Sequence, residues 1–221
     1  LFMSLGPRLK WIKSKIENKN SLTITFIILV MLTFFIIKNL TTDLLFYTVL
    51  ISAAFFLFFT TLKELFIKKF NNISQTVSHF GFSLLILSIL FNSILSSEII
   101  TNIKIGERYD YNKGEIFFKK VEERKESNFN SIIASFEIKD KNGKTIELKP
   151  EIRIYNQPAI ITSEADIRTT LLEDKFLVMN IVKGNEYFNI RYQVKSFMVW
   201  IWISVLLLSL GGLMNLFKRK I

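Results

Sequence analysis

The sequence predicts a multi-pass α-helical membrane protein with four spans and an all-β domain inserted between the third and fourth spans. Half of the 221 residues are hydrophobic and 22 are Phe, a composition too apolar for an ordinary soluble domain. Four apolar runs of about 20 residues are each long enough to cross a hydrocarbon core of roughly 30 Å as a helix. Short β-type segments fill the polar stretch between the last two runs.

The first two apolar runs cover residues 22–37 and 44–62. Only a short polar turn that includes Lys38 and Asp43 separates them. The turn is too short to form a domain, so the two helices are expected to form a transmembrane hairpin. A cleavable signal peptide is not expected, because no small-residue cleavage site follows the first run and three more spans come after it.

The third and fourth runs flank the polar segment. The third covers residues 78–95 and begins with His79, the only histidine of the chain. The fourth covers residues 198–217 and opens with Trp200 and Trp202, where an aromatic belt belongs at a membrane surface.

The polar segment, residues 97–197, is expected to form a small β-sandwich or barrel. Its segments are β-branched and aromatic, and several alternate apolar with polar residues as in half-buried strands. Asn142 and Gly143 predict a tight hairpin, and Lys183 and Gly184 a second turn. The chain has no cysteine, so the domain must be stable without disulfides. Seven strands are predicted: IITNIKI, EIFFKKV, SIIASFEI, KTIELKP, EIRIYN, KFLVMNIV and YFNIRYQV.

The distribution of charge predicts the orientation in the membrane. Residues 97–197 hold 17 basic and 16 acidic residues, whereas the rest of the chain holds 12 basic and 3 acidic residues. Of those 12 basic residues, 11 lie on one side of the membrane in the predicted arrangement of spans, and only Lys38 lies on the other side. The positive-inside rule therefore places both termini inside and the β domain outside. The basic residues face membrane lipid, and no nucleic-acid partner is expected.

The predicted organisation has seven parts. They are a basic inner segment (1–20), a transmembrane hairpin (21–63), an inner loop (64–77), a histidine-headed helix (78–96), the outer β domain (97–197), a last transmembrane helix (198–217) and an inner basic tail (218–221).

Seven short segments stand out along 210 residues of the chain. They are LGPRLKW from Leu5, SHFGFSLLILSI from Ser78, SSE from Ser96, IGE from Ile105, LKPEIRIYN from Leu148, TSEADI from Thr162 and WIWISVLLLSLGGLM from Trp200. In this order and spacing they resemble the C-terminal end of the CcmF-type haem lyases of cytochrome c maturation. No single segment would be specific alone, but seven in register are.

The resemblance implies a haem-handling function. The family takes haem from a haem chaperone at the outer face and helps to attach it to the Cys-x-x-Cys-His motif of apocytochrome c. It also holds a b-type haem within the membrane between two histidines from different helices. His79 stands at the position of the second histidine. It is therefore expected to be a metal ligand, bound to the haem iron near the inner side of the membrane, with Gly81 leaving room beside the ring.

The chain departs from the family in ways that bear on its partners. It lacks the tryptophan-rich WGxWWxWD segment and a second histidine, so the haem would be shared with a partner chain. The chain resembles a C-terminal fragment from a split gene, and Leu1 is not an initiator methionine. It would be part of a multi-subunit haem lyase and not catalytic alone. Its richness in Phe, Ile, Lys and Asn is typical of an AT-rich genome of an organelle or an endosymbiont and does not separate the two. The expected location is the mitochondrial inner membrane, with the β domain in the intermembrane space. The alternative is a bacterial inner membrane, with the β domain in the periplasm.

Two assignments have a simpler alternative. His79 could lie at the level of the lipid headgroups, bonded to Ser78 or to water. Glu151, Arg153 and Tyr155 alternate along a predicted strand and so share one face, where Arg153 could hold a haem propionate or a partner's carboxylate. They could equally form a plain ion pair on a solvated sheet face. No residue set for nucleophilic or metal catalysis is present.

Two functions follow from this sequence. The chain is either a haem-handling subunit of a haem lyase, or a cofactor-free membrane scaffold of a respiratory complex descended from the same family. A gene for the tryptophan-rich segment and a second transmembrane histidine in the same genome would favour the first.

Overall fold

The computed structural model describes residues 19–67, 73–141, 143–182 and 186–218. These form two compact units. One is helical and comprises the chain up to Leu95 and from Ser196 onward, and the other is the β-rich unit Ser96–Lys195.

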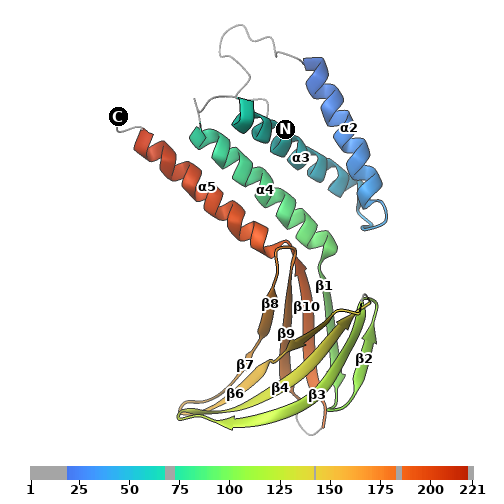
Figure 1. Ribbon diagram of the computed structural model, residues 1–221, viewed down its shortest axis with the longest axis vertical. Helices are drawn as coiled ribbons and strands as arrows, with labels where there is room; N and C mark the ends of the chain where they lie inside the picture. Colours follow the sequence, from blue (N-terminus) through green and yellow to red (C-terminus); the bar gives the residue numbers. More distant parts are fainter. Residues whose placement is uncertain (1–18, 68–72, 142, 183–185, 219–221) are drawn as a thin grey trace. The chain divides into compact units, whose positions relative to one another are not determined.

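The helical unit contains four described helices, and they pack in chain order (Figure 1). Each contacts the next, so that α2 lies against α3, α3 against α4, and α4 against α5. All four are long and apolar enough to cross a membrane, which confirms the four predicted spans. Their bounds are α2 Lys19–Ile37, α3 Leu44–Ile67, α4 Ile73–Leu95 and α5 Met198–Lys218.

The helices are longer than the apolar runs that predict them. The predicted inner loop, residues 64–77, lies largely within helix, because α3 continues to Ile67 and α4 begins at Ile73. Lys63 and Glu64 are charged and so end the apolar run, yet both residue types favour helix. The connection between α3 and α4 is therefore shorter than the hydropathy pattern indicates.

The β-rich unit is a sandwich of two sheets that contain ten strands. The four-stranded sheet has the order β1-β10-β9-β8, and the six-stranded sheet has the order β2-β3-β4-β6-β7 with β5 also paired to β4. The strands are β1 Ser97–Ile103, β2 Arg108–Tyr111, β3 Gly114–Lys125, β4 Phe129–Asp140, β5 Thr145–Leu148, β6 Glu151–Asn156, β7 Ala159–Glu164, β8 Asp166–Thr169, β9 Glu173–Ile181 and β10 Phe188–Ser196.

The core of the sandwich lies between the two sheets. Phe118 and Phe136 stack with their ring centroids 4.3 Å apart, and neither is exposed. Leu177, Met179 and Tyr192 reach the same cluster from the opposite sheet. The predicted alternation of more and less buried residues is clear in β9 and in β5, which belong to different sheets.

The sandwich contains the predicted hairpin, in the six-stranded sheet, and a pairing of the first and last strands, in the four-stranded sheet. Gly143 has φ +79°, a conformation that favours glycine, in the turn between β4 and β5. Asn142 and the second predicted turn, at Lys183 and Gly184, lie outside the described residues. The first and last strands pair antiparallel along their length, from Ser97 opposite Val194.

Candidate functional site

His79 is the seventh residue of α4, about 9 Å along the axis from its first residue at 1.5 Å per residue. Its side chain is half-buried. The neighbouring Phe80 contacts Phe58 of α3, with ring centroids 5.0 Å apart, and the charge of Glu64 near the end of α3 also acts on His79. His79 is therefore the sequence neighbour of a residue that contacts α3.

The imidazole has no hydrogen-bond partner among the residues that the structure describes. The predicted alternative partner, Ser78, lies against α5 instead. A Cβ atom built on Gly211 of α5 would come within 2.2 Å of the Ser78 Oγ atom. Within the described part of the chain, His79 is thus a polar group on a mostly apolar helix whose ring nitrogens have no partner.

The contact between α4 and α5 is close enough to require glycine on both helices. Ser74 donates a hydrogen bond to the Gly211 carbonyl at 2.7 Å. A Cβ on Gly81 would lie 2.9 Å from the Leu208 backbone nitrogen. The expectation that Gly81 leaves room for a cofactor is therefore wrong. Its missing side chain makes room for the backbone of α5.

The described part of the chain contains no cluster of three or more His, Cys, Asp or Glu side chains that could hold a metal ion. His79 can supply one nitrogen ligand. This donor fits one ligand position of a haem, and a second ligand would have to come from outside these 221 residues.

A second candidate site lies on β6, where Glu151, Arg153 and Tyr155 project to one face as predicted. The Arg153 Nη2 atom donates to Glu151 Oε2 at 3.1 Å. The Arg153 guanidinium carbon lies 5.2 Å from the ring centroid of Phe129 on β4, and the Phe129 and Tyr155 rings are 5.3 Å apart. We call these four residues the Arg153 cluster.

Within the Arg153 cluster, Arg153 and Glu151 form an ion pair, and the guanidinium has further N–H donors. The hydrogen bond from Arg153 lowers the pKa of Glu151 and, in return, raises the pKa of Arg153. The Arg153 side chain is 35% exposed. Its buried Nε atom has no hydrogen-bond partner in the described structure. The simple ion pair is therefore present, and the guanidinium retains donors for a further carboxylate.

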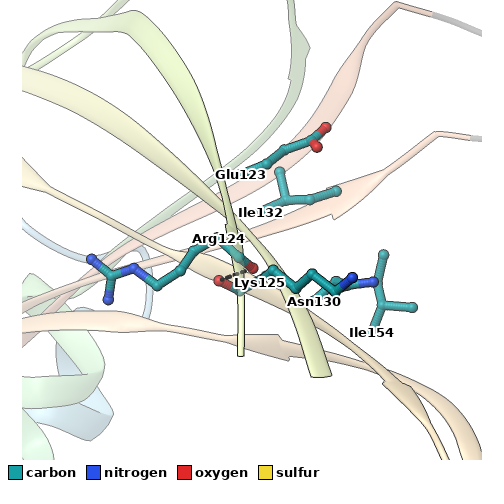
Figure 2. A pocket seen from close by; sticks show the side chains of 7 residues that line it. Glu123, Arg124, Lys125, Asn130, Ile132 and Ile154 are labelled. Atoms are coloured by element: carbon teal, nitrogen blue, oxygen red, sulfur yellow. Dashed lines mark hydrogen bonds between the residues drawn. The ribbon is translucent and has the colours of Figure 1, made fainter. Parts of the chain in front are cut away.

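An open hollow of about 500 Å³ lies on the β3, β4 and β6 strands. Figure 2 shows the charged side chains of Glu123, Arg124 and Lys125 beside Ile132 and Ile154. This hollow was not predicted, because it arises where β4 pairs with both β3 and β6. No local pattern could have indicated it.

Comparison with known proteins identifies the β-rich unit. Residues 94–196 match the family model described as the CcmF C-terminal beta-sandwich. Cytochrome c-type biogenesis protein ccl1 of Rhodobacter capsulatus is 32% identical over 123 residues, which are 56% of this chain and 19% of that protein. Cytochrome c-type biogenesis protein CcmF of Pseudomonas fluorescens is 28% identical over 145 residues, 65% of this chain and 22% of that protein.

The likeness extends beyond the β-rich unit. A solved structure named Cytochrome c Heme Lyase CcmF matches 96% of this chain and 37% of its own length, with a TM-score of 0.69 and 18% identity. That likeness shows the same fold, helices included. The matched region spans about a fifth of the length of the curated relatives. Residues 94–196 are therefore similar to the CcmF C-terminal beta-sandwich, and the chain shares its fold with part of the solved CcmF structure.

Proposed function

We propose that this chain is a haem-handling subunit of a haem lyase in cytochrome c maturation. In this proposal His79 is one axial ligand of a b-type haem in the membrane, and the β-rich unit docks partner proteins. The observation that carries the proposal is the half-buried imidazole of His79, which has no hydrogen-bond partner among the described residues and lies in a CcmF-type fold.

An unpaired polar group in lipid costs free energy. No water is available in the hydrocarbon core to satisfy a ring nitrogen, so a histidine there needs a partner. A neutral imidazole is a good ligand for haem iron, and the bond would remove that cost. The apolar rings of Phe80 and Phe58 on the adjacent helices offer a surface compatible with a porphyrin edge.

The residues of this chain would bind and orient the cofactor. A bound haem would supply one-electron redox chemistry. His79 would fix the iron at a defined depth. The interlocked α4 and α5 helices would hold the helix that carries His79 in position, because Ser74 and Ser78 both contact Gly211. No catalytic residue is assigned to this chain.

The second axial histidine and the tryptophan-rich segment would come from a partner chain. The matched region spans only about a fifth of its curated relatives. The haem chaperone and apocytochrome c would be further partners. The proposed location is the mitochondrial inner membrane with the β-rich unit in the intermembrane space, and a bacterial inner membrane with that unit in the periplasm is the alternative.

Purification through this chain in mild detergent is expected to recover a second membrane chain together with haem. The reason is that the chain has one histidine, whereas a bis-histidine haem needs two. A pyridine haemochrome spectrum measures the haem, and mass spectrometry identifies the partner. Recovery of a stable, haem-free single chain would contradict the proposal and favour the membrane scaffold.

Arg153→Ala is expected to weaken docking of the partner by about tenfold, a typical loss for one charge-assisted hydrogen bond in a contact. Arg153→Lys should retain only part of the binding affinity, because the lysine ammonium cannot form the two parallel hydrogen bonds that a guanidinium forms with a carboxylate. Binding of the purified haem chaperone and of an apocytochrome c peptide to the detergent-solubilised chain provides the measurement.

A matched control for Arg153 is available on strand β3 of the same sheet. Lys120 and Glu122 form an ion pair of the same two-residue spacing, and both side chains are exposed. Lys120→Ala should leave docking unchanged. Equal losses for Arg153→Ala and Lys120→Ala would show that general charge, and not the Arg153 cluster, governs the interaction.

A further inference from the structure

The β-rich unit has one end at which the chain both enters and leaves it, and we call this the tether end. Strand β1 begins at Ser97, two residues after α4 ends at Leu95. Strand β10 ends at Ser196, two residues before α5 begins at Met198. Because Ser97 lies opposite Val194 in the β1–β10 pair, both connections belong to the same end of the sheet.

The turn between β8 and β9 also lies at the tether end. Strands β9 and β10 are neighbours in the sheet, and the six residues between them span at most about 20 Å. If β9 and β10 were parallel, the connecting segment would have to cover the length of a nine-residue strand, about 30 Å. Six residues are too short for this, so the pair is antiparallel. The first residue of β9, Glu173, therefore lies at the end where β10 finishes.

This turn displays two leucines. Leu171 and Leu172 are 68% and 64% exposed, at positions where turns usually carry Gly, Asn, Asp or Ser. Thr170 closes the turn, since its backbone nitrogen donates to the Glu173 carbonyl at 3.0 Å and its hydroxyl accepts from the Glu173 nitrogen at 3.1 Å. The hydrogen bonds hold the leucines outward, away from the core of the sandwich.

Lysines from two other turns gather at the same end. Lys113, in the β2–β3 turn, places its Nζ atom 3.4 Å from Ser97 Oγ at the start of β1. Its carbonyl accepts a hydrogen bond from the Lys141 nitrogen in the β4–β5 turn at 3.1 Å. Lys113, Lys141 and Lys144 are all exposed, and none forms an ion pair with another described residue.

One buried lysine offsets part of the acidic charge at this end. Lys175 of β9 is buried and lies 2.8 Å from Asp140 of β4 and 3.4 Å from Glu173. Burial lowers the pKa of Lys175, but its hydrogen bond to Asp140 and the charge of Glu173 outweigh that effect and raise the pKa. Lys175 therefore stays charged at neutral pH and joins the β4–β5 turn to the leucine turn.

We propose that the tether end rests on the surface of the lipid bilayer, with Leu171 and Leu172 inserted into the interfacial layer. Lys113, Lys141 and Lys144 contact acidic lipid headgroups. Chain connectivity favours the bilayer as the partner of this surface. Single residues, Ser96 and Phe197, link the tether end to helices that are long and apolar enough to span a membrane. Exposed leucines beside unpaired lysines are the combination that binds the boundary between headgroups and acyl chains.

The full chain can be probed site by site, because it contains no cysteine. In Leu172→Cys, an environment-sensitive fluorophore is attached and the chain is reconstituted in phosphatidylcholine vesicles containing phosphatidylglycerol and doxyl-labelled phospholipid. The matched control is Ile181→Cys. Ile181 is the last residue of β9, at the opposite end of that strand from the leucine turn, and it is also exposed, at 44%. The label at residue 172 is expected to be quenched several-fold more by the doxyl lipid than the label at residue 181.

Each alternative outcome overturns the proposal. If aqueous iodide quenches residue 172 as strongly as residue 181, the leucine turn faces water. If residue 172 is shielded from both iodide and the doxyl lipid, it contacts protein and not lipid. Circular dichroism of both labelled variants verifies that the fold is retained. No haem is needed in the experiment, so its outcome is independent of the role of His79.

Charge reversal tests the lysines separately. Lys141→Glu with Lys144→Glu should reduce the quenching of residue 172 in vesicles that contain phosphatidylglycerol. The same variant should behave like the parent in pure phosphatidylcholine, where the headgroups carry no net charge. An unchanged signal in the acidic vesicles would show that the lysines do not contact lipid headgroups.

Discussion

His79→Ala is expected to remove the haem absorbance of the complex purified through this chain. An alanine supplies no ligand atom, and the chain contains no other histidine that could replace it. The β-rich unit should remain folded, because its core, built around Phe118 and Phe136, lies entirely within Ser96–Lys195. The pyridine haemochrome assay and the thermal unfolding of the purified complex measure the two effects.

A cavity variant separates loss of the ligand from loss of structure. His79→Gly leaves a space at the same position, and free imidazole added to the solution should partly restore the haem signal. Restoration would show that the pocket survives and only the nitrogen ligand was lost. If His79→Ala retains full haem content and cytochrome c maturation, His79 does not ligate the iron, and the scaffold hypothesis should be preferred.

Gly211→Val is expected to disrupt the pairing of α4 with α5. The first added carbon would lie 2.2 Å from Ser78 Oγ and 2.8 Å from the Ser78 backbone nitrogen, and the backbone cannot move aside as a flexible side chain can. Overpacking of this kind typically costs about 1–3 kcal/mol of folding free energy. The melting temperature of the detergent-solubilised chain should fall, and haem retention should fall with it, since His79 follows Ser78 directly.

The adjacent residue provides the control for this prediction. A Cβ on Gly212 would meet no atom within 4 Å, so Gly212→Val adds the same side chain to the same helix without a clash. Its melting temperature should stay close to that of the parent protein. Equal destabilisation by the two variants would mean that helix propensity, and not close packing against Ser78, explains the effect.

The sequence pattern is sufficient to predict the spans and the class of the inserted domain. Apolar length alone determines whether a helix can cross a bilayer, and this property is visible residue by residue. The ends of the helices are less visible, because Lys63 and Glu64 interrupt the hydropathy without interrupting the hydrogen-bonded backbone. Hydropathy indicates which residues can lie in the hydrocarbon core, whereas the residue at which a helix ends depends on local backbone preferences.

Three strands escaped prediction for related reasons. Strand β2 is short and rich in charged and polar residues, β7 follows Pro158 directly, and β8 has only four residues. Each lies at an edge of its sheet, where one side of the backbone and much of the surface is exposed. An edge strand therefore carries a weak apolar alternation, and its pairing is decided by the neighbour and not by its own sequence.

The candidate sites were predictable only where the information is local. The shared face of Glu151, Arg153 and Tyr155 follows from strand alternation within β6. The contact of Arg153 with Phe129 depends on the pairing of β4 with β6. The role of Gly81 depends on how closely α5 approaches, which involves residues more than a hundred positions away. Contacts of that kind have no signature in a short stretch of sequence.

The pairing of β1 with β10 also sets the order in which the chain can assemble. Strands β1 and β10 bring Ser97 and Val194 to within about 5 Å, so the long insertion between α4 and α5 then behaves as a very short loop. The entropy cost of closing a loop grows with the logarithm of its length, and sheets with distant partners form slowly. The α4–α5 pair is therefore expected to form late in folding, after the sandwich has closed, and its rate of formation should follow that of the β-rich unit.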